Sequence, residues 1–120
     1  MDETSRRILI IDDEKMIRDV VVRIMDMKGH TAVESESGDD AIELLKEDHD
    51  FDYAILDLSM PGEISGPQTF DLLLENYPDI KVIISTGYID QDDSKAYTER
   101  GAYAILEKPY KIDDILSLIQ

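Results

Sequence analysis

The chain has 120 residues, 42% of them hydrophobic, which is enough for one compact domain with its own core. It has no cysteine, and this excludes a disulfide scaffold, thiolate zinc sites and thiol catalysis. Twenty-eight acidic residues against 12 basic ones give a net charge of -16, which repels nucleic acid and anionic membranes and attracts divalent cations and basic partner surfaces. We therefore expect no direct DNA binding. The polar start MDETSRR, and the lack of an apolar run near ~18 residues, predict a cytoplasmic protein without a membrane span.

Five short apolar runs predict five β-strands. Their starts lie about 25 residues apart, which is too far for hairpins and typical of strand-helix-strand units. The runs cover residues 8–11, 31–33, 53–56, 81–84 and 103–106.

Between the strands, apolar residues recur three and four positions apart, the pattern of amphipathic helices. The clearest faces are Ile17, Val20, Val21 and Ile24, then Phe70, Leu73, Leu74 and Tyr77, and finally Ile112, Ile115, Leu116 and Ile119. Asp39 and Asp40 mark the first turn of a further helix, where carboxylates suit the helix dipole. Residues 91–100 offer only Ala96 and Tyr97 as apolar side chains, so we expect that helix to pack poorly and to be mobile or partner-facing.

Strands this apolar need cover on both faces, so the sequence predicts an α/β fold in which a five-stranded parallel sheet lies between two layers of helices. Residues 1–6 are expected to form a flexible tail and residues 7–120 the domain. Three methionines, Met16, Met25 and Met27, are assigned to the core as flexible filler.

Four of the five predicted strands end in residues that can do chemistry. In a parallel sheet these ends share one edge, and open α/β sheets bind ligands there, where the strand order reverses. The residues are Asp12 and Asp13 after the first strand, Asp57 after the third, Ser85 and Thr86 after the fourth and Lys108 after the fifth. If the first and third strands are neighbours, the three aspartates form an acidic pocket.

Three converging carboxylates repel one another unless they share a proton or bind a cation, and their hard oxygens favour Mg²⁺ over zinc or copper. A carboxylate beside Mg²⁺ can act as a nucleophile toward phosphorus. Lys108 and Thr86 could then stabilise the transferred group. Taken singly, each motif has an ordinary structural explanation, such as a helix cap for Asp12 and Asp13. Their arrival at one edge favours phosphoryl-transfer chemistry.

The stretches IIDDE, LDLSMP, ISTGY and LEKPY, in this order, resemble the receiver domain of two-component response regulators over essentially the whole chain. The resemblance implies a flavodoxin-like three-layer sandwich of five parallel strands in the order 2-1-3-4-5 with five helices. It implies that Asp57 accepts a phosphoryl group from a phosphohistidine on a histidine kinase or histidine phosphotransfer domain. Phosphorylation would then switch the activity of an output domain or a partner protein. A dimer that depends on phosphorylation is one way in which this could happen. Its only catalysis would be its own phosphorylation and dephosphorylation.

The same resemblance implies the roles of single residues. Asp57, Asp13 and the Ser59 backbone carbonyl would hold Mg²⁺, with Asp12 acting through water. Lys108 and Thr86 would bind the phosphoryl oxygens. The Leu58 and Gly87 amides would complete the cradle, Pro109 would follow a cis peptide, and Ser59 and Tyr88 would flank the path of the hydrolytic water.

Two features depart from the family pattern. The stretch PGEISG places four residues, where three are usual, between the proline and the next glycine. Ile105 stands at the switch position that often carries an aromatic ring, and Tyr103, two residues earlier on the same side of the strand, is expected to lie too far from the site. The usual relay from Thr86 to the partner surface is therefore not assured.

Three other functions were weighed. A phosphatase of the haloacid dehalogenase type needs a second aspartate two residues after the nucleophile, where this chain has Ser59, and a longer chain. An FMN carrier needs a hydroxyl-rich phosphate loop, whereas DDEKM would repel the cofactor phosphate. A binding module that is never phosphorylated would not need the set of Asp12, Asp13, Asp57, Thr86 and Lys108.

Overall fold

Five parallel strands form one sheet at the centre of the computed structural model, which describes residues 5–60, 62–87 and 89–119. The strands lie in the order β2-β1-β3-β4-β5, as the resemblance implied. They are β1 (Arg7–Ile11), β2 (Thr31–Ser35), β3 (Tyr53–Asp57), β4 (Lys81–Thr86) and β5 (Ala104–Glu107). The reversal of strand order falls between β1 and β3, so the crevice expected of such a sheet lies at their carboxyl ends.

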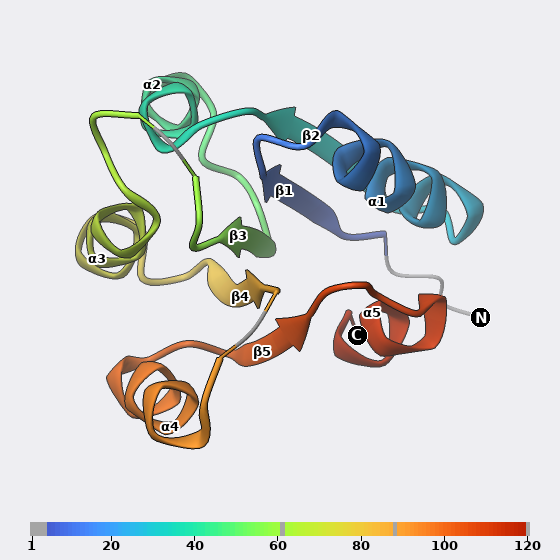
Figure 1. The fold of residues 1–120 in the computed structure, drawn as a ribbon. Helices are drawn as coiled ribbons and strands as arrows, with labels where there is room; N and C mark the ends of the chain where they lie inside the picture. The colour runs from blue at the N-terminus through green and yellow to red at the C-terminus, as the bar shows by residue number, and fades with distance from the viewer. Residues whose placement is uncertain (1–4, 61, 88, 120) are drawn as a thin grey trace.

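Five helices cover the sheet in two layers (Figure 1). They are α1 (Lys15–Met27), α2 (Gly38–Glu47), α3 (Gly66–Asn76), α4 (Gln91–Arg100) and α5 (Ile112–Leu118). One face of the sheet packs against α1 and α5, and the other against α2, α3 and α4. The three-layer α/β sandwich predicted from the apolar strands is confirmed.

Alternation along each strand feeds two separate cores. Ile8, Ile10 and Ile55 pack with α1 and α5, whereas Leu9 and Leu56 pack with α2 and α3. Both sets are buried because a parallel sheet has no solvent-facing side.

The helix patterns predicted the buried faces with some errors. Met25 is buried, but Met16 and Met27 are 80% and 66% exposed, so the assignment of these two to the core is wrong. Val20 and Ile112 are also exposed, although they belong to predicted apolar faces. A period of 3.6 residues fixes the centre of a helix face, but the edge depends on how far the neighbouring helix extends.

The fourth helix agrees with its prediction. None of the residues of α4, all of which the structure describes, is buried. Its contacts with the domain include the Tyr97 ring, edge-on to Phe70, and an ion pair between Arg100 and Asp71.

The amino-terminal segment is bonded to the domain earlier than the sequence predicted. The Ser5 hydroxyl donates to the Gly29 carbonyl at 2.8 Å, and the Arg6 amide donates to His30 Nδ1 at 3.0 Å. Residues 1–4 of the predicted tail lie outside the described residues.

Candidate functional site

Asp12 and Asp57 meet at the carboxyl edge of the sheet because β1 and β3 are neighbours. Their register pairs Ile11 with Leu56, so each aspartate is the next residue of its own chain segment. Both are almost fully buried, with 0% and 3% of their surface exposed, whereas Asp13 is exposed. The structure thus brings together the acidic pocket that the strand ends predicted.

The three carboxylates are close enough to share one cation. Asp12, Asp13 and Asp57 can each offer an oxygen atom such that all three lie within 4.8 Å of one another. Within the described part of the chain, Asp12 Oδ2 is also a buried oxygen without a hydrogen-bond partner. This buried oxygen belongs to a set of hard oxygen donors, which fits a divalent ion such as Mg²⁺, directly or through a bound water.

Lys108 supplies the positive charge of the pocket. Its Nζ lies 2.9 Å from Asp12 Oδ2, 3.0 Å from Glu14 Oε1 and 3.4 Å from Asp57 Oδ2. The contact with Glu14 is also a hydrogen bond, and all three contacts are ion pairs. One ammonium therefore faces three carboxylates, and the pocket keeps an excess of negative charge.

The pKa values of Asp57 and Lys108 are both raised, which disfavours the charge on the aspartate and favours the charge on the lysine. Burial raises the pKa of Asp57, and Asp12 adds to this, while the Ser59 amide and Lys108 offset part of it. For Lys108, burial by itself lowers the pKa, but Asp12, Glu14 and Asp57 together outweigh burial and raise it above its ordinary value. The lysine therefore stays charged, and the ionised form of Asp57 is disfavoured until another cation joins it.

Two backbone amides lie beside Asp57, and the structure separates their roles. The Ser59 amide donates to Asp57 Oδ1 at 3.0 Å. The Leu58 amide, assigned to the phosphate cradle by resemblance, instead donates to the Ser85 carbonyl at 3.2 Å as a continuation of the sheet. The role of the Leu58 amide in the phosphate cradle stays a prediction, and the Ser59 amide is a second donor that already faces the Asp57 carboxylate.

The loop after β3, which is one residue longer than the family pattern, is held at its far end. Ile64 donates its amide to Asp39 Oδ1 at 2.9 Å, and Ser65 caps α3 in a capping box with Gln68. Gly66 begins the helix directly against Leu58, where a Cβ atom would meet the Leu58 backbone at 2.5 Å. The absence of a side chain at Gly66 thus permits α3 to begin beside the residue that follows Asp57.

Two residues of the predicted site belong to β4. Thr86 is buried at the end of the strand, and its carbonyl accepts the Lys108 amide at 2.8 Å. Gly87 follows and is exposed. Tyr88, which was expected to flank the path of the hydrolytic water, lies outside the described residues.

A pair of hydroxyl groups that the sequence did not predict joins β4 to the segment after β5. Ser85, which pairs with Asp57 in the sheet register, is hydrogen-bonded through its hydroxyl to the hydroxyl of Tyr110. Burial raises the pKa of Tyr110 to about 12. The peptide between Lys108 and Pro109 is cis, as the resemblance implied.

Ile105 and Tyr103 take different positions along β5. Ile105 packs against the core formed with α2, α3 and α4, and it lines a groove of about 690 Å³ that α4, β5 and α5 border. Tyr103 lies just before the strand, where its ring packs edge-on against Tyr53 and faces Lys81. As predicted, the aromatic ring does not reach the acidic pocket.

A family model described as the response regulator receiver domain matches residues 8–120. Among curated proteins, the phosphate regulon transcriptional regulatory protein PhoB of Klebsiella pneumoniae is 32% identical over 97% of this chain and 51% of its own length. Sensor kinase CckA of Brucella abortus is 28% identical over 97% of this chain and 12% of its own length. The chain thus spans about half or less of these relatives.

Solved structures show the same architecture. A response regulator receiver domain protein from Clostridium thermocellum superposes with a TM-score of 0.86, at 28% identity, covering 95% of this chain and 90% of that one. Among the described residues, no helix is long and apolar enough to cross a lipid bilayer.

Proposed function

Since this chain belongs to the response regulator receiver domain family, we propose that Asp57 is a phosphoacceptor, phosphorylated in a Mg²⁺-dependent reaction by a phosphohistidine on a partner protein. The observation that carries the proposal is the convergence of Asp12, Asp13 and Asp57 within 4.8 Å, with Lys108 beside them. This combination supplies a nucleophile, a set of metal ligands and a cation for the transferred group in one crevice.

Asp57 attacks phosphorus through a carboxylate oxygen, forming an acyl phosphate while the bond from phosphorus to the donor imidazole breaks. Only the ionised carboxylate is nucleophilic, so the raised pKa of Asp57 has to be offset by positive charge. Lys108 provides part of that charge and turns toward the phosphoryl oxygens as the transferred group arrives. The Ser59 amide is placed to donate to the same group.

Asp13, Asp57 and the Ser59 carbonyl would hold the Mg²⁺ ion, and Asp12 would bind it through water. When bound, the ion neutralises the carboxylates and the charge of the phosphoryl oxygens. Thr86 and Gly87 lie at the end of β4, next to Asp57 in the sheet, and would bind the remaining phosphoryl oxygen. The change at Thr86 would be passed to a partner or output domain through the neighbouring surface of α4, β5 and α5.

Acetyl phosphate, a small phosphoryl donor, tests this function without a known kinase. With Mg²⁺, intact-mass spectrometry should detect one phosphoryl group on the wild-type chain and none on Asp57→Asn. Removing Mg²⁺ with a chelator should abolish the modification. Exposed Asp19→Asn serves as the matched control and should be modified like wild type. Phosphorylation of Asp57→Asn at the wild-type level would refute the assignment.

The competing binding module, which is never phosphorylated, makes a different prediction in the same experiment. It could still bind Mg²⁺ through its acidic pocket, but it would gain no mass with acetyl phosphate or with phosphorylated histidine phosphotransfer domains. The presence of both a nucleophile and a charged Lys108 in one pocket favours the phosphoacceptor.

A further inference from the structure

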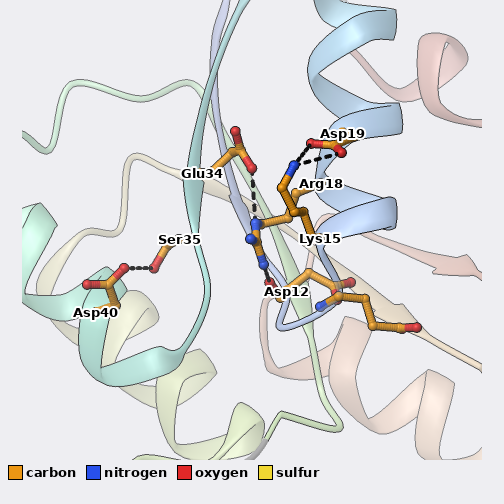
Figure 2. Close-up of polar contacts among 8 residues, drawn as sticks. Asp12, Lys15, Arg18, Asp19, Glu34, Ser35 and Asp40 are labelled. Atoms are coloured by element: carbon orange, nitrogen blue, oxygen red, sulfur yellow. Dashed lines mark hydrogen bonds and ion pairs between the residues drawn. The ribbon is translucent and has the colours of Figure 1, made fainter.

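Arg18 is a nearly buried charge next to the acidic pocket, and none of the roles described above uses it. Only 11% of its side chain is exposed. From α1 it reaches two partners, shown in Figure 2: its Nε donates to Glu34 Oε1 on β2 at 3.0 Å, and its Nη1 donates to the backbone carbonyl of Asp12 at 2.8 Å. The guanidinium thus bridges an edge strand and the chain segment that carries Asp12 and Asp13.

Other bonds already fix this segment. The Asp12 amide donates to the Ser35 carbonyl at 3.0 Å, and Asp12 Oδ1 accepts the Glu14 amide at 2.9 Å. Arg18 holds the carbonyl side of the same residue. Through these bonds the amide, the carbonyl and one carboxylate oxygen of Asp12 all have partners, and Oδ2 forms the ion pair with Lys108.

We propose that Arg18, held by Glu34, is a positioning residue for the metal site: it fixes the backbone of Asp12 and Asp13 so that their carboxylates are preorganised for Mg²⁺. The inference rests on the proposed function, because it concerns the same metal site. Groups that orient metal ligands from behind typically change metal affinity by about ten- to a hundredfold when they are removed. The positioning effect of Arg18 passes through its bond to the Asp12 carbonyl.

Charge alone predicts the opposite sign. Arg18 is a cation close to a cation site, so its removal would strengthen Mg²⁺ binding if only electrostatic attraction mattered. If Arg18 positions the ligands, its removal weakens binding in spite of the lost repulsion. The direction of the change therefore distinguishes the two roles.

Lys15 is a matched control on the same helix. It is 75% exposed and pairs with Asp19 one turn later, and Figure 2 shows this pair pointing away from Asp12. Lys15→Met and Arg18→Met each remove one positive charge from the first turns of α1. Only the second removes the bonds to Asp12 and Glu34.

The experiment measures the dissociation constant for Mg²⁺ by isothermal titration calorimetry, at a temperature where circular dichroism and thermal melting show every variant to be folded. Arg18→Met is expected to bind about tenfold more weakly than wild type. Lys15→Met should bind as wild type does or slightly more tightly. Equal or tighter binding by Arg18→Met would overturn the inference.

Arg18→Lys separates charge from geometry and carries the test if Arg18→Met does not fold. A lysine keeps the charge but lacks the planar fork that bonds two acceptors at once. Its affinity should also fall, and a lysine variant with wild-type affinity would overturn the inference.

The outcomes keep the two proposals apart. If wild type itself shows no binding that depends on Asp57, the metal site of the proposed function fails, and the positioning role fails with it. If wild type binds Mg²⁺ and neither Arg18 variant is weakened, only the role of Arg18 is refuted.

Discussion

Lys108 lies closer to Glu14 than to the nucleophile: its Nζ is 3.0 Å from Glu14 Oε1 and 3.4 Å from Asp57 Oδ2. Nζ donates a hydrogen bond to Glu14. We therefore expect Lys108 to lose its hydrogen bond to Glu14, at least in part, when a phosphoryl group is transferred to Asp57.

Glu14→Gln is accordingly expected to speed phosphorylation. The carboxylate of Glu14 is largely exposed, so its pair with Lys108 contributes about 0.2–1 kcal/mol, and releasing it should raise the rate by a factor of about 1.4 to 5. The measurement is the initial rate with acetyl phosphate at saturating Mg²⁺, which removes any effect on metal affinity. Exposed Glu43→Gln is the charge control, and a slower Glu14→Gln would contradict the idea that Glu14 competes for the lysine.

Asp57→Asn should raise the melting temperature in the absence of Mg²⁺. It removes one buried charge beside Asp12 at nearly constant shape, and burial already disfavours the ionised form. For wild type, a dissociation constant near ~1 mM means that about 10 mM Mg²⁺ adds roughly 1.4 kcal/mol, or several degrees. The gain should be smaller for Asp57→Asn.

Melting curves of both proteins, with and without the ion and at matched ionic strength, give the four values needed. The acidic pocket would be refuted if the asparagine variant were destabilised without Mg²⁺ or responded to the ion as fully as wild type.

The advantage of Asp57→Asn should also depend on pH. The pKa of Asp57 is raised in the folded state, so folding favours its protonated form, and stability lost by ionisation at neutral pH returns as pH falls through the raised pKa. The stability difference between Asp57→Asn and wild type should therefore shrink between about pH 7 and pH 4. Urea unfolding of both proteins without Mg²⁺ measures it, and a difference that grows on acidification would have the wrong sign.

Gly66→Ala should damage the region beside the site. Its new Cβ would meet the Leu58 backbone at 2.5 Å, and neither segment can move without shifting α3 or the end of β3. Overpacking of this kind costs about 1–3 kcal/mol, visible in urea unfolding. At Gly87 a Cβ would meet nothing within 4 Å, so the stability of Gly87→Ala should stay close to that of wild type. Similar losses in both variants would show that contact with Leu58 is not the cause.

The sequence predicted the layers of the fold and the position of the acidic pocket, because both follow from where apolar runs end. Asp12 and Lys108 each come directly after a strand, and Asp57 is the last residue of its strand. Parallel strands bring such residues to one edge of the sheet. The strand order itself came from resemblance to a family. Apolar runs alone do not determine which strands are neighbours.

Contacts within the pocket could not be predicted in the same way. Glu14 lies just before α1 and Arg18 lies in its first turn. No sequence pattern distinguishes either residue from an ordinary surface charge. Their partners, Lys108 and Glu34, are distant in sequence, and each pair depends on side-chain reach after the sheet has formed. Leu58 was assigned to the cradle by resemblance, but its amide bonds the neighbouring strand instead.

The missing buried face of α4 has an energetic consequence. Most helices of the domain would lose buried apolar contacts if they shifted, whereas α4 is attached mainly through Tyr97 and Arg100. We therefore expect alternative positions of α4 to differ little in free energy, and a bias of about 1 kcal/mol arising at the end of β4 would change their ratio about fivefold. One rearranged hydrogen bond is of that size. We therefore expect a small chemical change at the edge of the sheet to alter the position of α4 more than that of any better anchored helix.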